Sequence, residues 1–263
     1  MVRRKLAQFG ARALGMASEL QDTPRISVVV PVMNEEGNVQ MLVDEIVNAL
    51  RGVAPFEAIF VDDLSTDGTV SALTLAKATA PELRVIAHDK NCGQSSAVRS
   101  GVISARGELI ATLDGDGQNN PADIPNLIAQ YDRAGRDENE RMVAGQREKR
   151  QDTWSKRMAS KFGNGVRGFL LRDRTRDTGC GLKLFEREAY LRLPYFDHQH
   201  RYLPALMLRE GYEISHVDVS HRGRNTGTSK YTNLGRLWVS ISDIFGVIWL
   251  RNRCSLPSNR REL

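Results

Sequence analysis

The feature that most constrains the fold of this chain is an alternation, from residue 26 onward, of short β-branched runs with stretches of helical spacing. Each run ends in a polar loop, and a helical stretch follows the loop. Strands that alternate with helices build a parallel sheet covered by helices, so the sequence predicts an α/β fold. The expected strands are residues 26–30, 58–61, 83–87, 108–113 and 142–145; the expected helices are residues 39–50, 70–75 and 95–106, and residues 154–212 are expected to be helical with one tight loop at 177–181.

The charge balance is only mildly basic, with 37 Lys and Arg against 32 Asp and Glu, a net charge of +5. This excess suits a phosphate, a nucleotide or a membrane surface as partner, but aromatic residues are not interleaved with a basic groove as a nucleic-acid site requires. Cys92, Cys180 and Cys254 are too few and too scattered for a disulfide framework or a four-ligand zinc site. With no apolar run typical of a signal peptide near the start, we expect a cytoplasmic chain.

Two carboxylates stand two residues apart directly after the fourth expected strand, in the sequence Asp114-Gly115-Asp116-Gly117-Gln118. The glycines between them let the backbone approach a ligand closely. Mg²⁺ and Mn²⁺ prefer oxygen ligands and often take only one or two carboxylates, the rest coming from phosphate and water. The pattern favours a divalent cation that bridges a diphosphate, and an Asp/Gly turn without a ligand is the alternative.

Polar loops also follow the first two strands, with the sequences Pro-Val-Met-Asn-Glu-Glu at residues 31–36 and Val-Asp-Asp-Leu-Ser-Thr-Asp-Gly-Thr at residues 61–69. Taken alone, Asn34 and Asp67 could each be no more than a helix N-cap. Open parallel sheets bind ligands at the carboxyl ends of their strands. Since the two loops share that edge with Asp114, we expect the acids and amides of all three to surround one ligand.

In this order the three motifs resemble those of the family 2 glycosyltransferases, and most of all the dolichol- or polyprenol-phosphate sugar transferases, mannosyltransferases among them. The resemblance covers residues 26–250 and implies the GT-A fold, a Rossmann-like, mostly parallel sheet flanked by helices. It also implies a nucleotide-sugar donor and bound Mg²⁺ or Mn²⁺. The implied nucleotide-binding residues are Pro31, Asn34, Glu35, Asp62, Asp63 and Asp114, and the implied metal ligands are Asp114, Asp116 and Gln118.

The second half of the chain resembles the same subgroup in the segments that hold the acceptor phosphate. Residues 145–147 and 156–164 are two of these segments, and residues 222–231 resemble an Arg-x-x-Gly-x-Ser-Lys motif whose basic side chains face the diphosphate. On spacing alone, a helix would place Lys156, Arg157 and Ser160 on one face, either around one anion or as a solvated basic surface. The implied acceptor-phosphate residues are Arg147, Lys156, Arg157, Ser160, Asp177, Lys183 and Ser229.

One segment departs from the common pattern, because Lys183 stands where many relatives have Arg. Within that segment we expect Cys180 to be a small buried residue, since no activating His adjoins it.

A polyprenyl phosphate is already ionised, so it can attack the anomeric carbon without a strong general base, and direct displacement inverts the anomeric centre. The expected catalytic residues are Asp116, Arg224 and Lys230. A metal held by Asp116, with Arg224 and Lys230 nearby, would stabilise the departing diphosphate. The expected role is in cell-envelope glycan synthesis. A transferase with a non-lipid glycan acceptor and a binding module without turnover are the alternatives.

Apolar positions of residues 234–249 follow one helical face, and Arg251 and Arg253 come next. The segment is too short and too charged to span a bilayer. It is typical of an amphipathic helix that lies in the membrane interface, although a helix packed on the core is the alternative. We therefore expect a basic N-terminal extension at residues 1–24, a catalytic domain at residues 25–232, and a membrane-interface helix with a basic tail at residues 233–263, peripheral on the inner face of the cell membrane.

Overall fold

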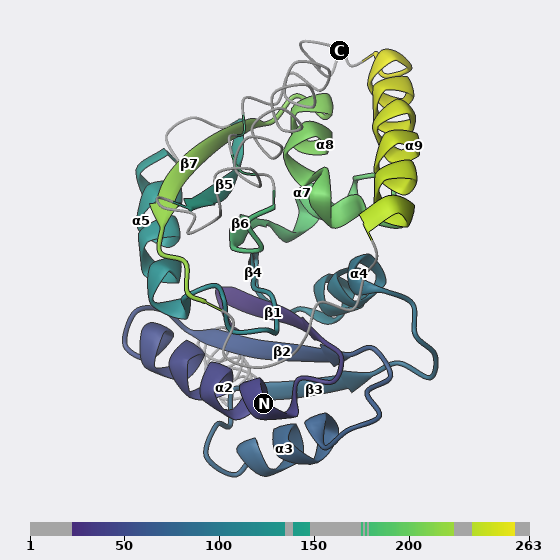
Figure 1. The fold of residues 1–263 in the computed structure, drawn as a ribbon. Helices are drawn as coiled ribbons and strands as arrows, with labels where there is room; N and C mark the ends of the chain where they lie inside the picture. Colours follow the sequence, from purple (N-terminus) through teal and green to yellow (C-terminus); the bar gives the residue numbers. More distant parts are fainter. Residues whose placement is uncertain are drawn as a thin grey trace, which may run out of the picture.

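The computed structural model describes residues 23–134, 139–147, 175, 177, 179–223 and 233–255. In that part of the chain, seven strands form one sheet in the order β3-β2-β1-β4-β6-β5-β7 (Figure 1). The strands are β1 (Ile26–Val32), β2 (Phe56–Asp62), β3 (Leu83–Ala87), β4 (Leu109–Thr112), β5 (Glu140–Arg147), β6 (Lys183–Glu186) and β7 (Glu213–Val219).

The first half of the sheet is parallel, as the sequence predicts. β1 pairs with β2 and β4, and β2 pairs with β3, all in parallel register. The helices α2 (Glu36–Leu50), α3 (Thr69–Ala76) and α4 (Gln94–Ser104) connect these strands. The strand order reverses between β1 and β4, and ligands of open α/β sheets bind at such a reversal. The loops after β1, β2 and β4 therefore meet where a ligand site is expected.

The second half of the sheet corrects the expectation of a helical block at residues 154–212 for residues 179–212, whereas residues 154–174 lie outside the described part of the chain. β6 is a strand in that block and pairs antiparallel with both β4 and β5. Its four residues, Lys-Leu-Phe-Glu, lack the alternation that marks a half-exposed strand, because three of them are buried. β7, which was not predicted either, pairs in parallel with β5. The rest of the block contains α7 (Arg187–Leu191), the short 3₁₀ helix η2 (Gln199–Arg201) and α8 (Leu203–Arg209).

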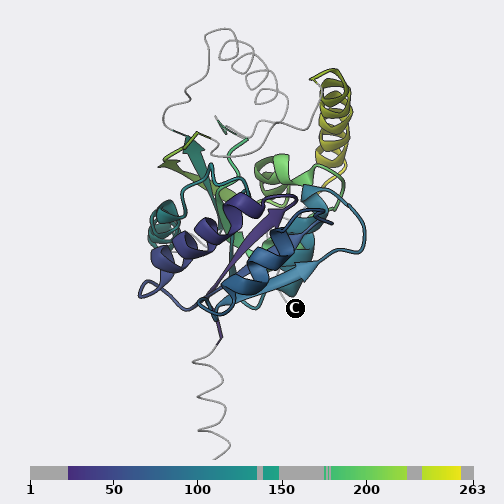
Figure 2. The ribbon, with the colours of Figure 1, turned by 60° about the horizontal axis from the view of Figure 1, so that its bottom comes forward.

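Two hydrophobic cores lie on opposite faces of the sheet, and β1 shows the alternation that separates them. Val28 and Val30 belong to one core and Val29 to the other. The first core is covered by α2, α3, the 3₁₀ helix η1 (Pro121–Asp123) and α5 (Ile124–Ala134); the second is covered by α4, α7, α8 and α9 (Asn233–Asn252). In both ribbon views α9 lies at the side of the molecule away from α2 (Figures 1 and 2).

A buried carboxylate ties the amino ends of the strands together. Glu57 of β2 is 3% exposed and accepts hydrogen bonds from Ser27 Oγ (2.7 Å), Arg84 Nη1 (2.6 Å) and the Arg106 N–H (2.7 Å). Burial acts to raise the pKa of Glu57, but these hydrogen bonds outweigh it and the pKa is lowered. The network lies at the edge of the sheet opposite the polar loops, so it stabilises the fold.

Candidate active site

The loops after β1 and β2 are held together by side chains that sequence patterns single out. Asn34 adopts φ +55°, a left-handed conformation that Asn tolerates. Its Oδ1 accepts from the Thr66 N–H (2.7 Å), and its own N–H donates to Ser65 Oγ (2.8 Å). Asp62, buried at the end of β2, accepts from the Ser65 N–H (3.1 Å). Asn34 therefore joins the two loops and does not cap α2, where Glu35 holds the N-cap position.

The start of α3 is fixed to the start of α2. Asp67 Oδ1 accepts from the Thr69 N–H (3.0 Å), although Gly68 and not Asp67 holds the N-cap position of α3. Thr69 Oγ1 in turn accepts from the Glu35 N–H (2.9 Å). A Cβ on Gly68 would lie 2.5 Å from Glu36 Cδ, so a larger residue there would displace the Glu36 carboxylate. These contacts give the expected nucleotide-binding edge a fixed backbone.

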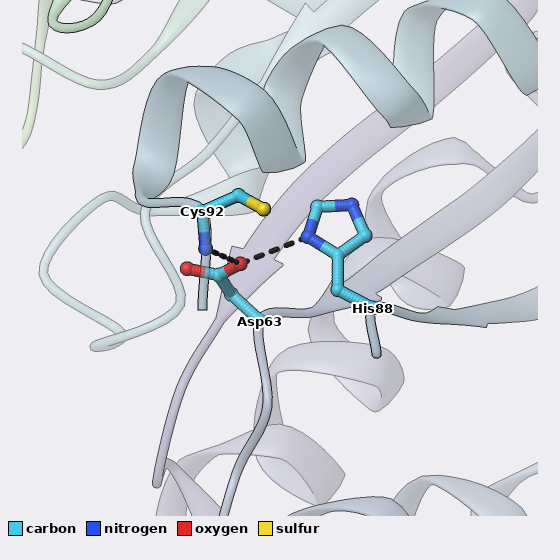
Figure 3. Close-up of side chains that lie close together, drawn as sticks. All are labelled: Asp63, His88 and Cys92. Carbon is cyan, nitrogen blue, oxygen red and sulfur yellow. Dashed lines mark hydrogen bonds and ion pairs between the residues drawn. The ribbon is translucent and has the colours of Figure 1, made fainter. Parts of the chain in front are cut away.

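Asp63 turns toward a third loop, the one between β3 and α4. Its Oδ1 accepts from His88 Nδ1 (2.8 Å) and the Cys92 N–H (2.8 Å), and its Oδ2 accepts from the Gly93 N–H (2.7 Å) (Figure 3). Gly93 has φ +82°, a conformation that favours glycine, directly before α4 begins. Asp63 thus positions the start of α4.

Residues 114–118, called the acid loop below, follow β4 and lie against β1. A Cβ on Gly115 would lie 2.8 Å from the carbonyl oxygen of Pro31, which places that expected nucleotide-binding residue beside the loop. Asp116 Oδ1 accepts from the Gln118 N–H (3.1 Å), and this bond shapes the turn that follows the second acid. The structure therefore brings Pro31 and the expected metal ligands to one place.

Asp114 lies at the centre of this arrangement. Its Oδ1 accepts from Gln94 Nε2 (2.8 Å), and its N–H donates to Asn119 Oδ1 (3.2 Å). Gly181 packs on the other side of the carboxylate, since a Cβ there would lie 2.5 Å from Asp114 Cγ. The carboxylate is thus held between α4 and the segment before β6.

Burial raises the pKa of Asp114, and the neighbouring charge of Asp116 raises it further. The charges of Lys183 and Arg147 and the hydrogen bond from Gln94 act in the opposite direction without cancelling the effect. Asp114 and Asp116 repel each other, and Gln118 follows two residues later, so the side chains of the acid loop offer oxygen donors. Asp114, Asp116 and Gln118 fit Mg²⁺ or Mn²⁺, because a divalent cation would relieve this repulsion.

Two of the residues expected around the acceptor phosphate, Arg147 and Lys183, act on the charge of Asp114, and a third, Asp177, pairs with Arg147. Arg147, at the end of β5, forms a two-pronged ion pair with Asp177, with Nη2 to Oδ1 at 2.7 Å. This pairing raises the pKa of Arg147. Lys183 is buried and donates to the carbonyl oxygen of Cys180. Cys180 is 1% exposed and burial raises the pKa of its thiol, which confirms it as a small buried residue.

A comparison of the sequence with protein families identifies the family of this chain. The family described as "Glycosyl transferase family 2" matches residues 27–193, which include all three polar loops, Arg147 and Lys183. The chain belongs to the family 2 glycosyltransferases.

Two curated relatives are similar over most of this glycosyltransferase. The dodecaprenyl-phosphate galacturonate synthase of Rhizobium johnstonii is 32% identical over 239 residues, which cover 89% of this chain and 69% of the relative. The undecaprenyl-phosphate 4-deoxy-4-formamido-L-arabinose transferase of Pectobacterium carotovorum subsp. carotovorum is 34% identical over 218 residues, 82% of this chain and 65% of the relative. The chain spans about two thirds of the length of these relatives.

Solved structures of other glycosyltransferases share the fold. Glucosyl-3-phosphoglycerate synthase from Mycobacterium tuberculosis, in complex with Mg²⁺ and UDP, has a TM-score of 0.64 and 17% identity over 89% of this chain and 81% of that one. The mannosyltransferase PcManGT from Pyrobaculum calidifontis, in complex with GDP-Man and Mn²⁺, has a TM-score of 0.59 and 20% identity over 78% of this chain and 58% of that one. At such identities the likeness shows the fold alone, and it confirms the predicted GT-A architecture.

Sequence reasoning missed the residues that orient Asp114 in this glycosyltransferase. Gln94 and Asn119 were not singled out, and Gly181 was noted only as part of a motif. A usable signal for Gln94 was its place after the third expected strand, which puts it at the same edge of the sheet as Asp114. Six expected site residues lie outside the described part of the chain: Lys156, Arg157, Ser160, Arg224, Ser229 and Lys230.

The chain just before Arg224 is nevertheless anchored beside the acid loop. The Arg222 N–H donates to the Gln118 carbonyl oxygen (3.1 Å), and His221 forms a β-bridge with Asn119. The Arg222 guanidinium contacts Glu45 (2.7 Å) and Asn120 (2.5 Å). The segment that carries Arg224 thus starts within reach of the expected metal ligands.

Proposed function

We propose that this glycosyltransferase moves a sugar from a nucleotide-sugar donor to a polyprenyl phosphate, with Mg²⁺ or Mn²⁺ held at the acid loop. One observation carries the proposal. The acid loop and the segment expected on the acceptor side meet at one carboxylate, because Gly181, two residues before Lys183, packs directly against Asp114, whose Oδ1 accepts from Gln94 Nε2. Both curated relatives above are named for work on a polyprenyl phosphate, which supports this acceptor.

On the donor side, we assign the nucleoside to the joined loops after β1 and β2. Pro31, Asn34, Glu35 and Asp62 lie there, and the hydrogen bonds between Asn34 and Thr66 fix the shape of the surface before any ligand binds. Such pre-organisation lowers the entropic cost of binding. Asp63 contributes through the start of α4, where it holds Cys92 and Gly93.

Asp114, Asp116 and Gln118 would hold the metal ion. A divalent cation bound there would neutralise charge on the leaving diphosphate. Gln94 keeps the carboxylate of Asp114 oriented through its 2.8 Å hydrogen bond. Arg224 and Lys230, which follow the anchored Arg222, would add positive charge on the same leaving group.

On the acceptor side, the phosphate supplies its own negative charge, so the chain needs no general base. Arg147 is pre-oriented by Asp177, and a guanidinium fixed in this way can bind phosphate with two hydrogen bonds. Lys183 adds a buried positive charge near Asp114. Direct attack on the anomeric carbon would invert the configuration. Lys156, Arg157, Ser160 and Ser229 stay predictions for this acceptor site.

The proposed sugar is mannose or a related hexose. A feature of the acceptor side is a reason to test other donor sugars as well. Lys183 replaces the Arg common in relatives, and a compact ammonium cannot make the two-pronged contact of a guanidinium. One relative named above handles galacturonate and the other a formamido-arabinose. Uronic acids and amino sugars therefore belong in any donor screen.

A screen of nucleotide sugars tests the function. UDP- and GDP-linked sugars, including mannose and galacturonate, are incubated with the chain, Mg²⁺ or Mn²⁺, and either undecaprenyl phosphate or a neutral glycan acceptor. Lipid-linked product with one donor, slow donor hydrolysis without acceptor, and no product from Asp116→Ala are expected. Transfer to the neutral glycan and none to the lipid phosphate would establish the alternative acceptor.

The surface of α9 supports a peripheral membrane location for this proposed function. Val247 is fully buried against the second core. One face of the helix therefore packs on the catalytic domain, as expected for the alternative of a helix packed on the core. The opposite face exposes Ile241, Phe245 (68%) and Trp249 (60%), which are spaced by four residues and form one stripe. An aromatic stripe followed by Arg251 and Arg253 suits the interface of an anionic bilayer. None of the helices in the described ranges is long and apolar enough to cross a membrane.

Replacing Phe245 and Trp249 together by Ala tests this membrane proposal. Sedimentation with anionic vesicles should weaken about tenfold or more, because two large apolar side chains no longer enter the interface. The melting temperature should stay unchanged, since both side chains are exposed. The matched control is Leu75→Ala with Ile103→Ala, which removes two exposed apolar side chains from α3 and α4. Equal binding losses in both double variants would refute a specific role for α9.

A further inference from the structure

Three side chains gather beside the ends of β2 and β3, and of these the proposed transfer reaction uses only Asp63, as a support for the start of α4. Asp63 comes from the end of β2, His88 follows β3, and Cys92 precedes α4. Their ligand atoms, a carboxylate oxygen, a ring nitrogen and the thiol sulfur, all lie within 4.8 Å of one another (Figure 3). We propose that Asp63, His88 and Cys92 form a second metal site, which takes a divalent transition-metal ion such as Zn²⁺.

The chemistry of the three donors selects against the metals of the acid loop. A thiolate and an imidazole favour Zn²⁺ and Co²⁺, whereas Mg²⁺ prefers oxygen ligands alone. Three protein ligands and one water complete the tetrahedral arrangement that Zn²⁺ adopts. The cysteine count alone excludes a four-cysteine centre, and this site instead draws its other ligands from two neighbouring strand ends.

His88 already has the partner that a metal-bound imidazole needs. Its Nε2 lies 2.9 Å from Ser100 Oγ on α4, while its Nδ1 faces Asp63 and Cys92. On metal binding, the Nδ1 proton moves to Nε2, which then donates to Ser100. A hydrogen bond on the far ring nitrogen fixes the tautomer and orientation of metal-bound histidines. The Cys92 thiol gives up its proton to solvent, so each ion bound releases one proton.

The geometry requires only a small adjustment. Bond lengths of about 2.0 Å to nitrogen and 2.3 Å to sulfur place tetrahedral ligand atoms about 3.5 Å apart. The three ligand atoms already lie within 4.8 Å of one another, so rotation of the Cys92 side chain and a slight shift of the His88 ring, whose Nδ1 is 2.8 Å from Asp63 Oδ1, reach this spacing. Asp63 keeps its hydrogen bonds from the Cys92 and Gly93 N–H groups, which hold the carboxylate in place.

The burial of the three side chains indicates how an ion would reach the site and what it would stabilise. Asp63 and His88 side chains are 6% and 12% exposed, and the partly exposed Cys92 offers the entry path. An ion bound here would cross-link the ends of β2 and β3 to the start of α4. Because Gln94, two residues after Cys92, donates to Asp114, the same ion would stiffen the support of the acid loop.

Cobalt titration of the EDTA-treated chain tests the site, with excess Mg²⁺ present to occupy the acid loop. We expect a thiolate-to-cobalt charge-transfer band that saturates at one equivalent of Co²⁺. Cys92→Ser should abolish the band and His88→Gln should weaken Co²⁺ binding at least tenfold. Cys254→Ser, which removes the other partly exposed thiol, should leave the band unchanged.

Alkylation of the unmodified chain gives a second measurement that needs no variant. Zn²⁺ should slow iodoacetamide modification of Cys92 at least tenfold and leave that of Cys254 unchanged, as quantified on the cysteine-containing peptides. A cobalt band that persists in Cys92→Ser, the absence of any band, or equal protection of both cysteines would overturn the proposal. Neither readout depends on glycosyl transfer, so the result stands apart from the proposed function.

Discussion

Adding one methyl group at Gly181 should disable the site while leaving the fold in place. A Cβ there would lie 2.5 Å from Asp114 Cγ and 2.7 Å from Asn119 Oδ1. Carbon atoms in contact keep about 3.5 Å apart, so the Asp114 carboxylate must retreat by about 1 Å. The backbone of Gly181 does not adopt a left-handed conformation, and the effect would come from the methyl group itself.

A displacement of about 1 Å in a catalytic group costs on the order of a hundredfold in rate. We expect Gly181→Ala to lower kcat for glycosyl transfer about a hundredfold and to raise the Mg²⁺ or Mn²⁺ concentration needed for half-maximal rate. The assay follows release of the nucleoside diphosphate from whichever donor the screen identifies, over a metal titration.

Gly246→Ala is the matched control, because a Cβ on Gly246 in α9 meets no atom within 4 Å. That variant should transfer at the wild-type rate. A thermal melt of both variants separates loss of the site from loss of the fold. If Gly181→Ala retains a kcat within threefold of wild type and the same metal dependence, the placement of Asp114 against Gly181 does not matter for catalysis and the reasoning is refuted.

Three further predictions concern buried or clustered acids. Asp116→Ala should abolish transfer at saturating metal with an unchanged circular dichroism spectrum, since it removes a ligand of the ion; activity within a few-fold of wild type would contradict the metal assignment. Asp114→Asn should raise the melting temperature of the chain in EDTA at pH 7 and abolish transfer. The folded state raises the pKa of Asp114, so its ionised form opposes folding above that pKa, and the advantage of the variant should vanish as the pH is lowered. Glu57→Gln should cost on the order of 2 kcal/mol of unfolding free energy at pH 7, because three hydrogen bonds to a buried carboxylate are weakened. The folded state lowers the pKa of Glu57, so the stability that it contributes is lost as the pH falls below about 4, and denaturant unfolding should show wild type and variant converging there.

The parallel half of the fold could be predicted because its signals are local. The apolar stripe of α2 repeats at helical spacing, and Val39, Leu42, Val43 and Ile46 are all fully buried. The three polar loops sit at strand ends, and parallel pairing of β1 with β2 and β4 brings them together. Local patterns therefore indicated both the architecture and the edge of the sheet at which the candidate site lies.

The remainder could not be predicted because it depends on contacts between distant residues. β6 is a strand only because it fits between β4 and β5, and its own four residues carry no clear pattern. Asn34 looked equally suited to capping a helix, and only the position of Thr66, 32 residues later, decides its role. The same holds for Gly181, which approaches Asp114 across 67 residues of chain. The spacing of residues along the sequence does not show which distant residues come into contact in the fold.

The position of β6 between β4 and β5 sets an order of events during synthesis of the chain. β5 leaves the ribosome first but has no direct partner in β4, because β6 separates the two. Until residues 183–186 emerge, the outer edge of β4 presents unpaired backbone groups, the kind of exposed edge on which chains associate wrongly. The carboxylate of Asp114 likewise lacks the support of Gly181 until then. A nascent chain can thus form the parallel half of its sheet early, whereas the surroundings of Asp114 are complete only after residues 181–186 have emerged.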